Sequence, residues 1–326
     1  MVTQAGTCWV VTDHAAGNQR QALALAAALG LAPRHLLLEA RAPWSWLAPH
    51  LAAGSRYALP PAQRAAFAPP WPRLAIGCGR QAALWTRRLR ALSGGSCYTV
   101  QILDPRMAPD HWDTVIAPRH DGLAGPNVID PLGSLNPVDD AWLAEARARW
   151  PQLGQLPSPR VGVLLGGPRR GIDLDADCAD ALARRLRDHC QAQAGSLLVV
   201  ASRRTPDAVA EAFRRHVRAA VPGLFWRNDD DGPNPYAGVL AWSDALVVTP
   251  DSVNMLSEAC AVGCPVHTFA SAPLPARIAR FHQALRQRGL LHDLGESVPV
   301  QAPPLRETAA VAALVRARMD ARTRSA

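Results

Sequence analysis

The sequence contains no lysine, since all 35 of its basic residues are arginines. This absence excludes a Schiff-base lysine, the phosphate-binding lysine of a Walker loop and a lysine general base. The sequence also lacks a GxSxG elbow, an HExxH pair and any CxxC pair. Its seven cysteines are odd in number and do not have zinc-site spacing, so we expect reduced thiols and no bound metal.

Long hydrophobic runs are missing too. No apolar stretch approaches the roughly 20 residues of a membrane span, and Met1–Val11 has neither the basic start nor the apolar core of a signal peptide. We therefore expect a cytoplasmic protein, or one held peripherally at the inner face of the membrane. Trp44, Trp46, Leu47 and Leu51 could dip into a membrane interface, although packing in a core is the favoured interpretation of this group.

The net charge is +8, from 35 arginines and 27 acidic residues. Because the arginines are scattered and not interleaved with aromatic residues, we do not expect a nucleic-acid partner. A phosphorylated small molecule is compatible with this charge.

Short β-rich segments alternate with longer helical patterns, which is typical of βαβ units and parallel sheets. The predicted strands are Cys8–Thr12, His35–Leu38, Leu74–Ile76, Tyr98–Ile102, Thr114–Ile116, Asn127–Ile129, Val161–Leu165, Leu197–Ala201, Ala245–Thr249 and Val266–Phe269. The 326 residues suffice for roughly two domains, and Pro151–Arg160, with three prolines and a glycine, resembles a linker. We predict one α/β domain over residues 1–155 and another over 156–305. Residues 306–326 are predicted to form a C-terminal helix that packs back on the first domain.

Ligands of open parallel sheets bind at the carboxyl ends of the strands, where helix N-termini present free N–H groups. Three predicted loops occupy such positions: Asp13–Asn18, Gly166–Gly171 and Thr249–Asn254. The last leads into a helix over Ser252–Val262, capped by Asp251 or Ser252.

The glycine pair Gly166 and Gly167 lets backbone amides approach a phosphate, which Arg169 and Arg170 could neutralise. A tight strand-to-helix turn with two solvated arginines explains the same residues equally well. Further donors of the phosphate-binding type follow another predicted strand, at Ser202, Arg203, Arg204 and Thr205, for which a surface turn is the alternative.

Asp13, His14 and His120 are the candidate general bases, because carboxylate and imidazole groups titrate in the useful range. A lone histidine is more often structural than catalytic.

Eight segments, taken in order, resemble the Elm-type mitochondrial fission family, which has many bacterial members. They are DHAAGNQRQALALAAALG (13–30), DPR (104–106), PRHD (118–121), GPNV (125–128), LLGGPRRG (164–171), ASRRTP (201–206), NPY (234–236) and VTPDSVNMLSEACAVGCPV (248–266). The resemblance runs from about residue 8 to residue 290. It implies a GT-B-like α/β fold, in which two Rossmann-like domains with parallel sheets face a central cleft.

The resemblance also implies site residues. The segment Ser252–Pro265 is similar to the donor-binding helix of sugar transferases that make peptidoglycan and lipid A. In those enzymes the helix N-terminus faces the diphosphate, and the glutamate corresponding to Glu258 holds the ribose. The donor side would comprise Gly166, Gly167, Arg169, Arg170, Ser202, Arg203, Arg204, Asn234, Tyr236, Asp251, Ser252, Asn254 and Glu258. The acceptor-side loop would contribute Gly17, Asn18 and Gln21.

The resulting hypothesis is a metal-independent glycosyltransferase that uses a nucleotide-diphosphate sugar as substrate, has no cofactor, and acts on an acceptor that the sequence does not identify. Two alternatives stay open. One is a GT-B scaffold that binds a protein partner without catalysis. The other is a nucleotide-sugar epimerase or hydrolase on the same fold.

Overall fold

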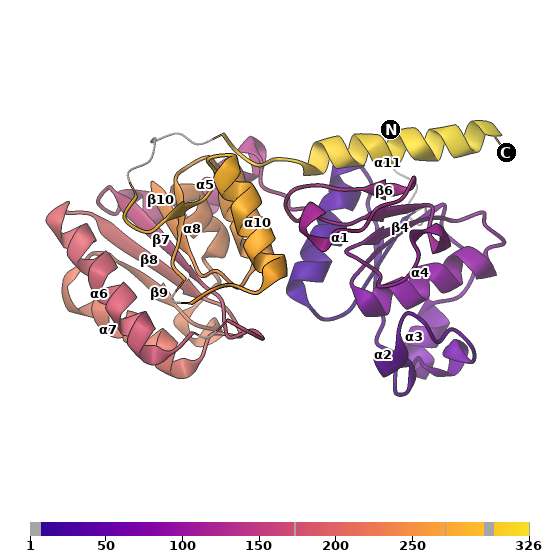
Figure 1. The fold of residues 1–326 in the computed structure, drawn as a ribbon, viewed down its shortest axis with the longest axis horizontal. Coiled ribbons are helices and arrows are strands. Elements are labelled where there is room, and N and C mark those ends of the chain that lie inside the picture. Colours follow the sequence, from indigo (N-terminus) through magenta and orange to yellow (C-terminus); the bar gives the residue numbers. More distant parts are fainter. Residues whose placement is uncertain (1–7, 173, 271, 297–302, 326) are drawn as a thin grey trace. The chain divides into compact units, whose positions relative to one another are not determined.

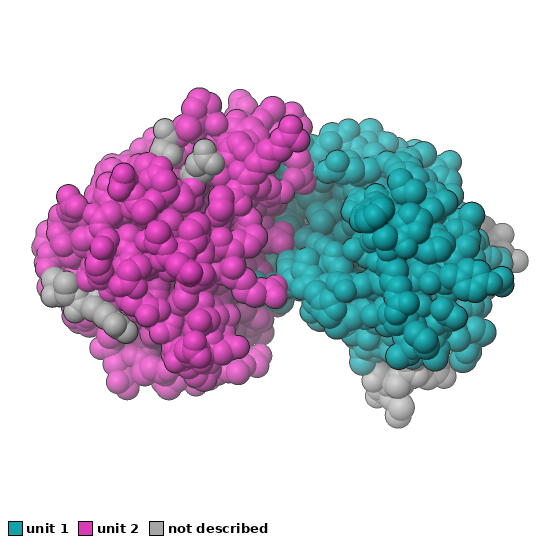
Figure 2. Space-filling view, turned by 90° about the horizontal axis from the view of Figure 1, so that it is seen from below, with its two compact units in different colours: residues 1–137, 307–326 teal, residues 138–306 magenta. Residues whose placement is uncertain are grey.

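The computed structural model describes residues 8–172, 174–270, 272–296 and 303–325, which form two compact units (Figure 2). Unit 1 comprises residues 1–137 and 307–326, and unit 2 comprises residues 138–306. Each unit is built on a six-stranded sheet whose strand pairs are all parallel. The α/β class expected from the alternating sequence pattern is therefore confirmed.

The sheet of unit 1 has the order β2-β1-β3-β4-β5-β6. Its elements are β1 (Cys8–Thr12), α1 (Ala16–Ala28), β2 (Arg34–Leu37), α2 (Trp44–Leu47), η1 (Ser55–Tyr57), α3 (Pro61–Ala66), β3 (Leu74–Cys78), α4 (Arg80–Leu92), β4 (Tyr98–Ile102), η2 (Pro109–His111), β5 (Thr114–Ile116), η3 (Arg119–Asp121), β6 (Val128–Ile129) and α11 (Thr308–Ser325).

Both faces of this sheet are covered, as the alternation of side chains along β1 illustrates. Cys8 and Val10 belong to a core cluster with α1 and α11, whereas Trp9 and Val11 belong to a cluster with α4 and the segment 38–71. A sheet with two apolar faces needs strands that are hydrophobic along their whole length, which is why all five residues of β1 are buried.

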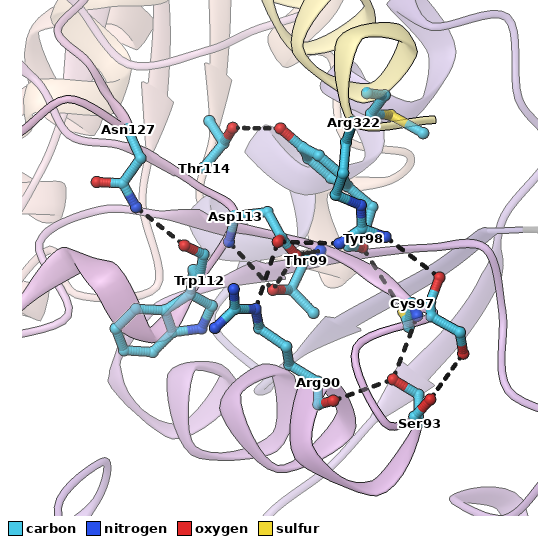
Figure 3. A network of polar contacts seen from close by, with 12 residues as sticks. Arg90, Ser93, Cys97, Tyr98, Thr99, Trp112, Asp113, Thr114, Asn127 and Arg322 are labelled. Carbon is cyan, nitrogen blue, oxygen red and sulfur yellow. Dashed lines mark hydrogen bonds and ion pairs between the residues drawn. The ribbon is translucent and has the colours of Figure 1, made fainter. Parts of the chain in front are cut away.

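The C-terminal helix α11 is fixed to unit 1 by a polar network around Asp113 (Figure 3). Arg322 donates from Nη1 to Asp113 Oδ1 (2.9 Å), and its guanidinium lies 4.9 Å from the ring centre of Tyr98. The other carboxylate oxygen accepts from the backbone N–H of Thr99 at 2.7 Å. Together with the packing of α11 on α1, these contacts make the helix part of unit 1 although it follows unit 2 in the chain.

The sheet of unit 2 has the order β12-β11-β10-β7-β8-β9. Its elements are α5 (Asp140–Arg149), η4 (Pro151–Gln155), β7 (Arg160–Leu165), α6 (Ala176–Ala192), β8 (Ser196–Ala201), α7 (Asp207–Ala220), β9 (Gly223–Trp226), η5 (Asp229–Asp231), α8 (Tyr236–Trp242), β10 (Ala245–Val248), α9 (Val253–Val262), β11 (Val266–Thr268), α10 (Ala276–Gln287) and β12 (His292–Asp293). Helices α6 and α7 share a core cluster with one face of the sheet, and α8 and α9 contact strands from the other (Figure 1).

The boundary between the units lies at Pro137/Val138, before the proline-rich segment 151–160 that resembled a linker. Helix α5 and η4 belong to unit 2 because their side chains pack on α8. A Cβ atom on Gly238 would lie 2.5 Å from Trp150 Cγ, and one on Gly154 would lie 2.6 Å from the ring of Trp242. The ring of Trp150 packs on Gly238 and that of Trp242 packs on Gly154, and these contacts fix the segment to the rest of unit 2.

Candidate functional site

Three loops of unit 2 meet at the carboxyl ends of β7, β8 and β10, around the carboxylate of Asp251. This side chain is only 3% exposed. Its Oδ2 accepts from the Gly167 N–H (3.3 Å) and from Arg204 Nη2 (2.7 Å), and its Oδ1 accepts from Thr249 Oγ1 at 2.7 Å. A buried carboxylate needs such donors to offset its lost hydration. Asp251 therefore joins the three loops and does not cap a helix.

The glycine pair has a different role from the one expected. The N–H of Gly166 donates to Thr249 Oγ1 at 2.7 Å and that of Gly167 to Asp251, so both amides predicted to face a phosphate have partners within the protein. A Cβ on Gly166 would lie 2.0 Å from Asp251 Oδ1, and one on Gly167 would lie 2.1 Å from the carbonyl oxygen of Arg204. Glycine is needed here because the neighbouring loops approach the β7 loop so closely.

Helix α9 begins directly after this junction. Ser252 is its N-cap, and its hydroxyl accepts from the Met255 N–H at 3.3 Å. Arg169 Nη1 donates to the carbonyl oxygen of Asp251 (3.0 Å), and His282 Nε2 of α10 donates to that of Pro250 (3.0 Å). Burial lowers the pKa of His282 to about 4, so its imidazole is neutral at pH 7. The loop before α9 is thus held from two sides.

Glu258 lies in the second turn of α9 and is 3% exposed. Its Oε2 accepts a hydrogen bond from the hydroxyl of Tyr236, the first residue of α8. The side chain of Asn234 accepts from the Tyr236 N–H at 2.9 Å and so fixes the start of α8. These contacts connect Asn234, Tyr236 and Glu258, which the family resemblance placed together on the donor side.

The arginines predicted for the donor side fall into two groups. Arg169 and Arg204 bind the Asp251 loop, as described above. Arg170 and Arg203 lie on the same two loops, and all four arginines are exposed. Ser202 is half-buried and accepts on Oγ from the Arg204 N–H at 3.2 Å. Arg170 and Arg203 are better placed to meet a dissolved anion than Arg169 and Arg204, which already bind the protein.

Asp13 follows β1 in unit 1 and makes short-range contacts. Its Oδ1 accepts from the Ala15 N–H (3.0 Å) and from Asn18 Nδ2 (2.9 Å). Asn18 lies against the neighbouring β3 loop, where a Cβ on Gly79 would be 2.4 Å from Asn18 Nδ2. Gly17 and Gln21 belong to α1, where Gln21 is buried and its Nε2 lies 3.4 Å from the Gly17 carbonyl oxygen. The predicted acceptor-side residues therefore lie in the first turns of α1, and Asn18 connects them to the β3 loop.

The two candidate histidines differ in environment. His14 is 62% exposed, and its Nε2 lies 3.8 Å from Glu39 Oε1. His120 is 4% exposed, in η3 after β5, with Nε2 3.6 Å from Asp121 Oδ1. Solvent reaches the imidazole of His14 freely, whereas that of His120 is enclosed. Within the described residues, we find no group of three His, Cys, Asp or Glu side chains arranged to hold a metal ion.

The sequence indicated no individual role for Thr249 or His282, and it assigned Thr205 to phosphate binding; in the structure all three support the unit 2 loops. Thr205 Oγ1 lies 2.9 Å from the Leu165 carbonyl oxygen, so it links the β8 loop to the end of β7. Thr205 closely follows the predicted strand Leu197–Ala201, and Thr249 is the last residue of the predicted strand Ala245–Thr249, which is the one signal the sequence offers for a structural role of either. His282 lies on α10, and nothing in its neighbourhood in the sequence indicates a contact with Pro250.

Comparisons with known proteins agree on fold and family. The family model for mitochondrial fission ELM1 matches residues 16–319. The chain is 32% identical over 281 residues to mitochondrial fission protein ELM1 of Arabidopsis thaliana, covering 77% of this chain and 65% of that protein. It therefore spans slightly less than two thirds of that relative.

Two solved structures resemble the chain over most of its length. A UDP-GlcNAc 2-epimerase from Methanocaldococcus jannaschii, in complex with UDP-GlcNAc and UDP, has a TM-score of 0.54 at 10% identity, covering 95% of this chain and 98% of that one. A UDP-glucosyltransferase from Polygonum tinctorium has a TM-score of 0.52 at 12% identity, covering 100% and 95%. At this identity the likeness establishes a GT-B-like fold alone.

Proposed function

Because the chain belongs to the mitochondrial fission ELM1 family and has a GT-B-like fold, we propose that it is a metal-independent glycosyltransferase whose unit 2 binds a nucleotide-diphosphate sugar. The observation that carries this proposal is the arrangement around α9. A capped N-terminus, a buried Glu258 one turn further on and the Tyr236 hydroxyl lie on adjoining helices at the carboxyl edge of one sheet.

The diphosphate is proposed to lie at the N-terminus of α9. Helix N-termini carry partial positive charge and free N–H groups, which suit an anion. Exposed Arg170 and Arg203 supply further charge in place of a divalent metal. Preorganised donors of this kind also stabilise the charge that develops on a leaving diphosphate.

Glu258 is proposed to accept hydrogen bonds from the ribose hydroxyls. Its Oε2 already accepts from Tyr236, which fixes the carboxylate before a ligand arrives. A fixed acceptor loses little conformational entropy on binding and so contributes more affinity. Tyr236 is then a positioning residue for Glu258.

In the proposed transfer, the bond from the anomeric carbon to the diphosphate oxygen breaks as the acceptor oxygen bonds to that carbon. The nucleotide diphosphate leaves, and the acceptor proton passes to a base. Asp13, His14 and His120 are the candidate bases, and the exposure of His14 makes it the easiest for a proton to reach.

Calorimetric titration with uridine diphosphate and uridine-diphosphate sugars tests this proposal. We expect saturable binding, weakened at least about tenfold in Glu258→Gln, which keeps the shape and the Tyr236 contact but loses charge. Glu211→Gln, an exposed site on α7, is the matched control and should bind as the unchanged protein does. Equal thermal melting of the variants shows that a loss is not due to unfolding.

A binding scaffold is a second candidate, favoured by one observation. The Gly166 and Gly167 amides already donate to Thr249 and Asp251, so this loop is satisfied without a phosphate. Absence of binding across uridine, guanosine, cytidine and thymidine diphosphates and their sugars would contradict the transferase and support the scaffold. Hydrolysis of a bound donor without any acceptor would instead point to an epimerase or hydrolase.

A further inference from the structure

Unit 1 exposes three large apolar side chains within the short segment 46–57, on α2 and η1: Trp46, Leu47 and Tyr57, which we call the aromatic tip. Their exposed fractions are 74%, 51% and 56%. They are three of the six large apolar side chains that are exposed within the described part of the chain. In Figure 1, α2 and α3 project from unit 1 beyond α4. Packing in a core, the favoured interpretation of the Trp44–Leu47 segment, therefore does not hold for Trp46 and Leu47.

The tip is held in place by contacts beneath it. Arg80 of α4 donates to the carbonyl oxygens of Ser45, Trp46 and Ala48, at 3.0, 2.9 and 3.2 Å. Trp44 donates from Nε1 to the Ala53 carbonyl oxygen at 2.8 Å. These bonds satisfy the carbonyls at the end of α2 and leave Trp46 and Leu47 directed away from the fold. A group of exposed apolar side chains on a well-fixed backbone is a candidate binding surface for an external partner.

The charge of the sequence segment that contains the tip is strongly one-sided. Residues 40–103 contain eight arginines and no aspartate or glutamate, so the remaining 27 arginines and 27 acidic residues of the chain balance. The whole net charge of +8 therefore belongs to this segment. Glu39 and Asp104 adjoin this segment in the sequence, and the Glu39 carboxylate lies 3.8 Å from the His14 imidazole.

Several of these arginines adjoin the apolar side chains. The Arg56 guanidinium lies 4.6 Å from the ring centre of Tyr57 and donates to the Tyr57 hydroxyl at 2.5 Å. The Arg64 guanidinium lies 5.9 Å from the same ring. Arg41, two residues before the segment Pro43–Leu47, is exposed as well. The tip thus combines interfacial aromatic residues with guanidinium groups that can bind phosphate oxygens.

We infer that the aromatic tip and the arginines Arg41, Arg56 and Arg64 form a docking surface for an anionic phospholipid bilayer. Trp46 and Leu47 would enter the headgroup region, and the guanidinium groups would bind lipid phosphates. The charge complementarity favours this occupant over a neutral apolar partner. The inference concerns unit 1 and does not depend on nucleotide-sugar binding.

Vesicle flotation with the full chain tests the inference. We expect binding to phosphatidylcholine vesicles that contain phosphatidylglycerol, weak binding to phosphatidylcholine alone, and loss of the difference at high salt. Trp46→Ser with Leu47→Ser should lower the partition coefficient at least about tenfold. Arg56→Gln with Arg64→Gln should lower the preference for the anionic vesicles by about tenfold or more.

Matched controls lie elsewhere on the protein. Leu92→Ser with Leu314→Ser removes two side chains of comparable exposure, 46% and 51%, and Arg288→Gln with Arg324→Gln removes two exposed arginines outside the segment 40–103. Both pairs should bind vesicles as the unchanged protein does. Quenching of tryptophan fluorescence by brominated lipids should occur in the unchanged protein and largely disappear in Trp46→Phe.

Three outcomes would overturn the inference. The first is no preference of the unchanged protein for anionic vesicles. The second is equal loss of binding in the tip variants and their controls. The third is binding to a single-stranded oligonucleotide that the tip variants lose while vesicle binding is unchanged, which would assign the surface to nucleic acid.

Discussion

The carboxyl edges of the two sheets are built differently, although each follows the same strand-loop-helix pattern. In unit 2 the buried Asp251 binds Gly167 and Arg204, which lie 84 and 47 positions away in the chain. In unit 1 the corresponding loop carries Asp13, whose side chain binds Ala15 and Asn18, two and five positions away. Asp251 therefore joins loops that follow several strands, whereas Asp13 binds within its own turn, and it is Asn18 that contacts the neighbouring β3 loop.

Because of this difference, substitutions at the two edges should affect stability and activity differently. A substitution at the unit 2 edge breaks contacts between strands and lowers stability, so loss of activity there has two explanations. A substitution in the unit 1 loop leaves the fold largely intact, so loss of activity there reports on chemistry. Substitutions at each of the two edges test this contrast.

Gly166→Ala should lower the free energy of unfolding by about 3 kcal/mol, because the new methyl group forces Asp251 from its site and breaks its hydrogen bonds. A Cβ at this position would lie only 2.0 Å from Asp251 Oδ1. Urea denaturation followed by circular dichroism measures the change.

Gly122→Ala in unit 1 is the control. Gly122 has a φ of +73° with no atom within 4 Å of a Cβ, so alanine meets backbone strain there but no neighbour. We expect a cost of about 1 kcal/mol. Equal losses in the free energy of unfolding at the two positions would show that the close approach of Asp251 is not what requires glycine at position 166. That result would contradict the proposed difference between the two edges.

The glycine pair also illustrates how far the sequence predicts the site. Its position after a strand is readable from the sequence, because apolar runs and glycines report local structure. Its partners are not, since Thr249 and Asp251 lie more than 80 residues away. The sequence therefore predicts that this loop lies at the carboxyl edge of the sheet. It does not predict that the Gly166 and Gly167 amides bind side chains that come near only in the folded sheet.

The fold itself was more predictable than the site. The strands Cys8–Thr12, Tyr98–Ile102 and Thr114–Ile116 have the predicted bounds, because each is a β-branched, buried run. The short strands β9 (Gly223–Trp226) and β12 (His292–Asp293) were missed. They lie at the two edges of the unit 2 sheet, where pairing with one neighbour is enough and the hydrophobic pattern is weak.

The pH dependence of stability should also differ between the edges. Burial lowers the pKa of His282 to about 4, against an ordinary value of about 6.5. In the unfolded chain the His282 imidazole therefore binds a proton near pH 6.5, whereas in the folded protein it binds one only near pH 4. The contribution of His282 to the free energy of unfolding should be fully present above about pH 6.5. It should decrease by up to about 3 kcal/mol as the pH is lowered to about 4.

His282→Gln isolates this contribution, because its side-chain amide can still donate to the Pro250 carbonyl oxygen but does not titrate. We expect the variant to lose less stability than the unchanged protein between pH 6.5 and 4, in urea titrations at each pH. Identical losses would mean that His282 is not buried as a neutral imidazole.

A matched pair of carboxylates compares the two edges directly. Asp251→Asn should cost about 2 kcal/mol, because it weakens the charge-assisted bonds to Gly167 and Arg204 in a buried site. Asp13→Asn should cost less than about 0.5 kcal/mol, since the amide oxygen still accepts from Ala15 and Asn18. Thermal unfolding of both variants in parallel measures the difference, and a reversed order would remove the distinction between the two edges.

Hydrogen–deuterium exchange with and without a uridine-diphosphate sugar tests the central claim, that unit 2 holds the nucleotide sugar, most directly. We predict slower exchange in peptides that cover Ser202–Thr205, Asn234–Tyr236 and Val253–Glu258, and smaller or no change in those that cover Asp13–Asn18. Slower exchange confined to Asp13–Asn18 and the other loops of unit 1 would contradict the assignment of the donor to unit 2.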